Sequence, residues 1–201
     1  MFQASSEPTD QRILDETLGQ IRAHGARRTT VLSIAAALGM THANVYRYFP
    51  SKAALFDAAT ARALAPLEAE LREIVDAPDP AADKIERMAG AVHRAYRDFA
   101  ARDPDLFALL ADSVVSGRGV GRKHRARVQA AFQRAVEEGI AGGAFEGIDA
   151  RRAVAFLFDA LHRFIHPVSV RLDREAGDAA MAQRLDRVAG ATLRALTQGR
   201  G

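Results

Sequence analysis

Between Thr30 and Lys52 the chain carries several side chains that could bind duplex DNA. The amide of Asn44 can form two hydrogen bonds with the edge of an adenine, and Arg47 can reach a phosphate or a guanine. Lys52 follows Ser51, so its ammonium would lie beside helix-start amides that already favour a phosphate. From residue type and position, the candidate DNA contacts are Thr30, Thr41, His42, Asn44, Arg47 and Lys52.

The spacing of small and apolar residues in this stretch predicts two helices that would position these side chains. Ala35 is small at the point where the backbones of two steeply crossing helices would meet, and Gly39 can take a positive φ in the turn between them. Val45 would place an apolar side chain in the contact between the two helices. Thr41 is a suitable N-cap for a second helix over residues 42–48. In a DNA-binding helix-turn-helix, this second helix enters the major groove. A buried helix pair without a DNA-binding role could show the same spacing.

The residues in and around this stretch resemble the signature of the TetR family of transcriptional regulators. The matching positions are Thr30-Val31, Ile34-Ala35, Gly39-Met40-Thr41, Tyr46-x-Tyr48-Phe49 and Pro50-Ser51-Lys52-x-x-Leu55-Phe56. The resemblance covers roughly residues 11 to 56 and does not extend into the rest of the chain. It implies that Tyr46 and Tyr48 contact backbone phosphates or bases, which adds them to the candidate DNA contacts. It also implies a ligand-responsive regulator, most often a repressor, that dimerises through its last two long helices.

The distribution of charge supports DNA binding more than the total charge does. The formal net charge is only +3. Residues 22–52, however, contain five basic side chains and no acidic one. A local positive surface of this kind attracts phosphates. An ordinary solvated surface is the alternative explanation.

The composition places the protein among cytoplasmic proteins. The chain of 201 residues has no cysteine, so neither a disulfide framework nor a thiolate metal site can form. The N-terminal residues lack the basic-then-apolar pattern of a secretory signal, and no uncharged apolar run approaches the ~20 residues that span a bilayer. We therefore expect a protein with no membrane partner and no cofactor.

Helical periodicity throughout the chain predicts an all-α fold of about nine helices. Residues 1–56 would form a three-helix DNA-binding domain, and residues 57–201 a larger helical domain for effector binding and dimerisation. Pro66 falls inside the helix that follows Ser51 and should bend or break it. Residues 116–127 are rich in glycine and basic side chains, but their spacing fits neither nucleotide-binding fingerprint. We expect them to form a solvated loop before a helix that begins near Val128.

The segment from Ala150 to about Leu172 is an unusually apolar helix. Between residues 153 and 170 only Asp159 and Arg163 are formally charged. A helix so apolar around its circumference must be covered on more than one face. Together with the last helix it suggests a four-helix interface in a two-fold dimer, although a purely intramolecular core would also cover it. The candidate interface residues are Phe156, Leu157, Leu161, Phe164, Val168, Leu185, Val188 and Leu193.

The larger domain is expected to hold a pocket for a small, largely apolar effector. Its candidate lining residues are aromatic or polar members of apolar helix faces, namely His93, Tyr96, Phe99, Phe107, Phe132, Phe158 and His162.

Enzymatic chemistry has little support in the sequence. Only His162 and His166 stand at i, i+4 spacing on one helix, where a third ligand such as His93 could complete a metal site. No HExxH pattern accompanies them, and Pro167 follows directly, so packed or pocket histidines are the favoured interpretation. The sequence therefore predicts a regulator released from a palindromic operator by its effector, and not an enzyme. The alternative is a helical ligand-binding or metal-dependent protein whose helix-turn-helix is structural.

Overall fold

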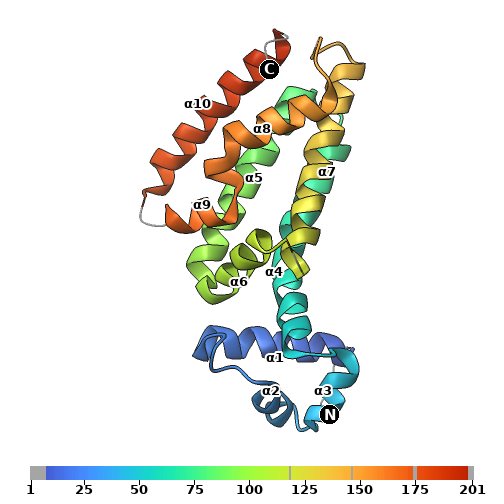
Figure 1. Cartoon of the computed structure of the whole chain (residues 1–201), viewed down its shortest axis with the longest axis vertical. Helices are drawn as coiled ribbons and strands as arrows, with labels where there is room; N and C mark the ends of the chain where they lie inside the picture. Colours follow the sequence, from blue (N-terminus) through green and yellow to red (C-terminus); the bar gives the residue numbers. More distant parts are fainter. Residues whose placement is uncertain (1–7, 118, 146, 174–175, 199–201) are drawn as a thin grey trace, which may run out of the picture.

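The computed structural model describes residues 8–117, 119–145, 147–173 and 176–198. Within these ranges the chain forms ten helices and no strand, which confirms the all-α fold. Three helices form an N-terminal head at one end of the molecule, and the others form an elongated helical body (Figure 1). The helices are α1 Thr9–His24, α2 Val31–Ala37, α3 His42–Tyr48, α4 Lys52–Asp76, α5 Ala81–Arg102, α6 Pro104–Val115, α7 Gly119–Ala141, α8 Ala150–Ile165, α9 Pro167–Leu172 and α10 Asp178–Thr197.

The head is built largely from local signals. The hydroxyls of Thr30, Thr41 and Ser51 cap α2, α3 and α4, each by accepting a hydrogen bond from the backbone N–H three residues later. Gly39 has a φ of +66° in the turn between α2 and α3, a conformation that residues with a Cβ rarely adopt. Val45 is completely buried and anchors α3 to the core of the head. These signals fix the direction of α3 relative to α2.

The long helix α4 joins the head to the body. It packs against α1 in the head and against α5 and α7 in the body. Pro66, which was expected to bend or break this helix, does not break it, because α4 continues through it to Asp76. Pro66 itself is exposed, while Leu64 and Leu67 on either side are buried in the core and hold the helix in place. A displacement of α4 in the body would therefore be transmitted to the head.

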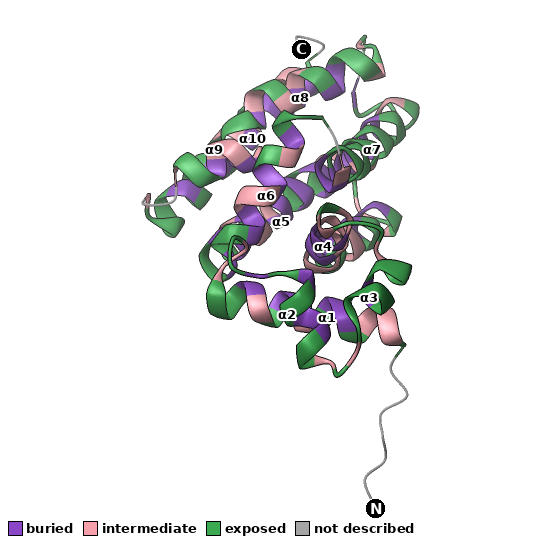
Figure 2. Ribbon diagram, turned by 60° about the horizontal axis from the view of Figure 1, so that its bottom comes forward, coloured by how far each residue is buried: buried purple, intermediate pink, exposed green. Residues whose placement is uncertain are grey.

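The body is organised around α5. This helix packs against α4, α6, α7, α8, α9 and α10, and the faces turned toward it are buried (Figure 2). Its own inner face buries Ile85, Met88 and Val92 completely. A core shared by so many helices means that cavities in the body are walled by several elements at once.

Two expectations about helix bounds in the body are corrected. The loop expected over residues 116–127 is largely helical, because α7 already begins at Gly119 and buries Val120 and His124. The apolar helix expected from residue 150 to about 172 divides at His166 into α8 and α9. Pro167 lacks the N–H that would continue α8, and it starts α9 instead.

The segment Ala150–Leu172 would be long and apolar enough to cross a membrane by length and composition alone. In the structure it is a core segment of the body, with 44% of its most apolar window buried against other helices. No such segment was expected from the sequence, because only apolar runs without a charged residue were considered. This segment contains two charged residues, Asp159 and Arg163.

The head docks on the body where the end of α1 meets the start of α6. The guanidinium of Arg22 donates two hydrogen bonds, of 2.6 and 3.0 Å, to the carboxylate of Asp103. Asp103 is buried and precedes α6, but its side chain does not cap that helix. The backbone N–H of Ala26 donates to the Asp105 carboxylate at 2.7 Å. Two carboxylates at the start of α6 thus hold the end of α1.

We expect the Arg22–Asp103 pair to contribute about 1 kcal/mol to the free energy of unfolding, because Arg22 is half exposed and solvent screens its charge. A double-mutant cycle of Arg22→Ala and Asp103→Asn, followed by urea denaturation, measures this coupling. Additive effects of the two substitutions would show that the head is held without this pair.

Candidate nucleic-acid interface and ligand cavity

The outer face of α3 is free to meet a duplex. Val45 is the only residue of α3 that is buried, and the residues from Thr41 to Asn44 and from Tyr46 to Tyr48 are all exposed. Tyr46 and Tyr48 are 43% and 48% exposed, which is unusual for aromatic side chains. The structure therefore brings the α3 candidates together on one surface.

The remaining candidate contacts flank α3. Thr30 and Thr41 are exposed, and their hydroxyls already serve as helix caps. The ammonium of Lys52 is partly buried, 3.5 Å from the carbonyl oxygen of Ala26 and 4.9 Å from the centre of the Phe56 ring. Lys52 thus ties the α1–α2 turn to α4, as well as standing near the start of α4 where a phosphate would be favoured.

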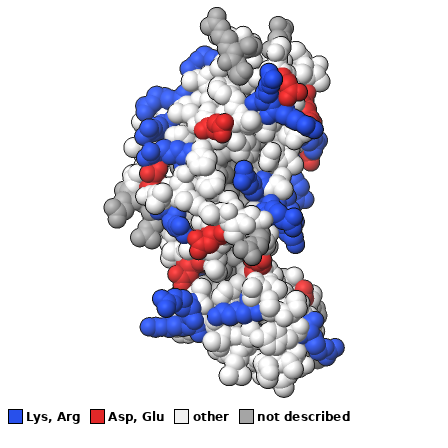
Figure 3. Space-filling view, in the orientation of Figure 1, with Lys and Arg blue, Asp and Glu red and all other residues white. Residues whose placement is uncertain are grey.

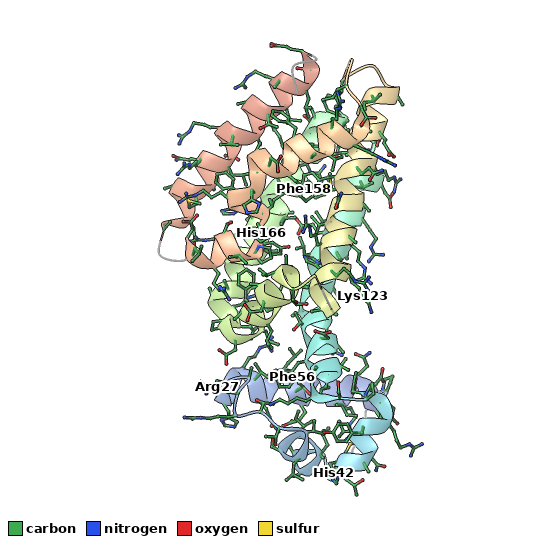
Figure 4. All side chains as sticks on the ribbon, viewed as in Figure 1. Arg27, His42, Phe56, Lys123, Phe158 and His166 are labelled. Carbon is green, nitrogen blue, oxygen red and sulfur yellow. The ribbon has the colours of Figure 1, made fainter. Side chains whose placement is uncertain are left out.

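Basic side chains lie at several places on the visible face of the head. Figure 3 shows Lys and Arg on both sides of the head, whereas the acidic side chains in that view lie closer to its junction with the body. Arg27 and Arg28 were not among the predicted DNA contacts, but both are exposed in the turn between α1 and α2. Arg27 projects from the side of the head and His42 lies at its outer end, away from the body (Figure 4). The surface around α3 is suited to phosphates on either side of a groove.

A cavity of about 180 Å³ lies in the body among α5, α6, α7 and the junction of α8 with α9. Three of the predicted pocket residues, Tyr96, Phe158 and His162, line it. The sequence missed the other lining residues, which are Val114, Arg125, Val128, Asp159, Ile165, His166 and Pro167. The spacing of four residues between His162 and His166 could have indicated that His166 also lines the cavity. Arg125 could not be predicted, because residues 116–127 were expected to form a loop.

The other predicted pocket residues lie in the core around the cavity. Phe132 packs edge-on against Phe158 with ring centres 5.4 Å apart, and Phe99 packs against Phe107 at 5.5 Å. The Nδ1–H of His93 is positioned to donate to the carbonyl oxygen of Phe164 at 3.1 Å. These side chains support the cavity wall without lining it.

A chain of hydrogen bonds leads from the cavity to α4. The hydroxyl of Tyr96 is 3.0 Å from Nε2 of His124, whose Nδ1 is 2.8 Å from the Glu68 carboxylate on α4. Arg127 donates to the second carboxylate oxygen of Glu68 at 2.7 Å. All three members of the Tyr96–His124–Glu68 chain are buried or partly buried.

The surroundings of Glu68 and Tyr96 shift the pKa values of these two groups in opposite directions. Burial alone would raise the pKa of Glu68, but the hydrogen bond from His124 and the charges of His124 and Arg127 outweigh it and lower that pKa. Burial raises the pKa of Tyr96, so its hydroxyl keeps its proton. With Glu68 ionised, His124 donates to it through Nδ1–H, and Nε2 on the other side of the ring faces the Tyr96 hydroxyl.

Two family models cover most of the chain. The model described as bacterial regulatory proteins of the tetR family matches residues 13–59, and the one described as a tetracyclin repressor-like C-terminal domain matches residues 81–189. The second alone covers more than half of the chain. The protein belongs to the TetR family. It is thus a transcriptional regulator of a family whose members bind DNA through a helix-turn-helix and respond to small molecules.

Solved structures share this fold. A putative transcriptional regulator from Pseudomonas aeruginosa PAO1 superposes with a TM-score of 0.70 at 19% identity, covering 94% of this chain and 90% of its own. A TetR/AcrR-family regulator from Thermobifida fusca gives 0.61 at 21%, covering 96% and 98%. FadR from Bacillus subtilis in complex with stearoyl-CoA gives 0.58 at 18%, covering 94% and 98%. At these identities the likeness concerns the fold alone. A search of curated proteins found no match.

The histidines of this TetR-family protein do not assemble a metal site in the part of the chain that the structure describes. No three His, Cys, Asp or Glu side chains gather there in a way that could hold a metal ion. His162 and His166 stack with ring centres 4.4 Å apart, while His93 is engaged with the Phe164 carbonyl. Their spacing of four residues places the two rings in contact.

Most of the residues that were predicted to form a dimer interface lie inside the protomer. Leu157, Leu161 and Phe164 of α8 are buried against the protomer's own helices, as are Leu185 and Leu193 of α10. The remaining members, half-buried at the edge of this core, are Phe156, Val168 and Val188. The intramolecular core accounts for the apolar pattern of these helices. Of the predicted interface residues, only the three half-buried ones remain partly accessible to a second subunit.

A second, more open hollow of about 540 Å³ lies between α4 and α7 on the outside of the body. Its walls include Leu71 and Val75 of α4, with Arg127 and Arg134 of α7 at its rim. Both arginines are engaged in ion pairs, with Glu68 and with Asp76, at 2.7 Å each. None of the predicted pocket residues lines this hollow.

Proposed function

We propose that this TetR-family regulator is a homodimeric repressor, released from a palindromic operator by a small, largely apolar effector. Two copies of α3 would occupy successive major grooves about 34–36 Å apart. Residues 1–56 would read the operator, and residues 57–201 would bind the effector and the second subunit. We expect this regulator to act in the cytoplasm without enzymatic activity, cofactor or membrane partner.

The observation that carries the proposal is the Tyr96–His124–Glu68 chain. It begins at the wall of the cavity and ends on α4, the helix that also packs against α1 in the head. A ligand that disturbs Tyr96 would change the contact between α7 and α4, and so the spacing of the two heads. The ligand must bind the DNA-incompetent form better, and a tenfold loss of operator affinity needs about 1.4 kcal/mol of such preference.

The experiment is a gel shift of the purified protein on its own promoter DNA, with and without effector candidates. We expect an effector to weaken the DNA complex at least about tenfold, with two-fold symmetry in the protected sequence. The variant Tyr96→Phe keeps the ring and removes the hydroxyl, so it should bind the operator normally and respond less to the effector. An unchanged response in Tyr96→Phe would refute the role of the chain.

A further inference from the structure

His166, which lines the cavity, has one buried polar atom without a partner among the described residues. Nδ1 of His166 is shielded from solvent and makes no hydrogen bond to them. The position of the residue is nevertheless well fixed, because its ring stacks on His162 and its backbone N–H donates to the His162 carbonyl oxygen at 3.0 Å. Figure 4 labels Phe158 on α8 and His166 at the junction of α8 with α9. A bound molecule that pairs with Nδ1 would recover the free energy lost by burying it alone.

The buried part of the wall carries no charge near neutral pH. Of the ten described lining residues, only Arg125 and Asp159 are formally charged, and both are exposed and opposite in sign. Burial, together with the charges of His162 and Arg125, lowers the pKa of His166, and burial raises the pKa of Tyr96. An ionised ligand group would lose its hydration inside the cavity without meeting a buried counter-charge.

The size of the cavity restricts the ligand further. An engineered apolar cavity of about 150 Å³ holds benzene, so a cavity of about 180 Å³ accommodates one six-membered ring with a small substituent. The rings of Tyr96 and Phe158 and the side chains of Val114 and Val128 supply the apolar surface for such a ring. A hydroxyl substituent both donates and accepts, so it can pair with either tautomer of a neutral His166.

We infer that the cavity binds an uncharged, single-ring molecule whose hydroxyl group hydrogen-bonds to Nδ1 of His166. The inference rests on the proposed function only in treating this cavity as the effector site. It narrows the effector from a small, largely apolar molecule to a monocyclic alcohol or phenol.

The test is isothermal titration calorimetry of the full-length protein, without DNA, at pH 7.5. Three probes share one ring: phenol carries a neutral hydroxyl, toluene has no polar group, and benzoate is ionised. We expect phenol to bind at least about tenfold more tightly than either of the others, because only phenol pairs with Nδ1 and stays uncharged.

Two variants separate the hydrogen bond from the shape of the cavity. His166→Phe keeps a ring of similar size and removes the polar atom, so the preference for phenol over toluene should fall to within about twofold while toluene binding is retained. Retained toluene binding also reports that the variant is folded. The matched control is His24→Phe, which makes the same chemical change at an exposed histidine of α1 in the head, away from the cavity. It should preserve the preference for phenol.

Four results would overturn the inference. They are equal binding of phenol and toluene to the natural protein, tightest binding of benzoate, an unchanged phenol preference in His166→Phe, and no binding of any of the three probes. One further result would contradict the proposed function without contradicting this inference. If phenol binds with the expected preference but leaves the operator complex intact, release by an effector in this cavity is contradicted and the ligand class stands.

Discussion

The double substitution Asn44→Ala with Tyr46→Ala should weaken binding to the specific operator by about 100-fold or more. Both side chains lie on the exposed face of α3, on either side of Val45, the residue that anchors this helix to the head. A bidentate amide contact with a base is worth about 1–3 kcal/mol of discrimination, and a second lost contact adds to it. Binding to unrelated DNA should change much less, because it depends on the basic side chains around the head.

The measurement is the ratio of specific to non-specific affinity at one salt concentration, since DNA affinities depend steeply on salt. Both positions are exposed, so the free energy of unfolding should change little. Gln129→Ala serves as the control, because Gln129 is an exposed amide on α7 in the body. An unaltered specificity ratio in the double variant would mean that the helix-turn-helix is structural and that DNA, if bound at all, is read elsewhere.

The head could be predicted from the sequence because its signals act over short distances. Thr41 caps α3, Gly39 makes the turn and Val45 faces the core, and each needs only neighbouring residues to take up its role. Exposure of the α3 candidates then follows from helix geometry, because one buried position leaves the other faces free. The contact of Lys52 with the Ala26 carbonyl was not expected, because it joins segments 26 residues apart.

The ligand cavity could be predicted only in part because its walls come from distant segments. Tyr96 and Phe158 were found as aromatic members of apolar helix faces, but nothing local distinguishes them from Phe107 and Phe132, which fill the core. The interpretation of residues 116–127 as a loop also removed Arg125 from consideration. Glycine is permissive in any conformation, so its frequency there suggested a loop, whereas tertiary packing makes the segment helical.

Gly121 is the residue where that packing is tightest, and Gly121→Ala should lower the free energy of unfolding by about 3 kcal/mol. A Cβ at this position would stand 2.4 Å from the backbone nitrogen of Val114 and 2.5 Å from the carbonyl carbon of Ser113. Both are backbone atoms and cannot move away by a change of rotamer, so α6 and α7 would have to separate. The backbone N–H of Gly121 also donates to the Ser113 hydroxyl at 2.8 Å, and separation would lengthen this hydrogen bond.

Denaturation by urea at a fixed protein concentration measures this loss, with Gly19→Ala as the matched control. Gly19 is exposed in α1 and has nothing within 4 Å of the position of an added Cβ, so alanine there should stabilise the protein by up to about 1 kcal/mol through helix propensity. Opposite signs for the same chemical change would identify close backbone approach as the cause. If Gly121→Ala were neutral, α6 and α7 would not cross as tightly as described. Because Val114 also lines the cavity, the separation of these helices should weaken binding of the single-ring probes as well.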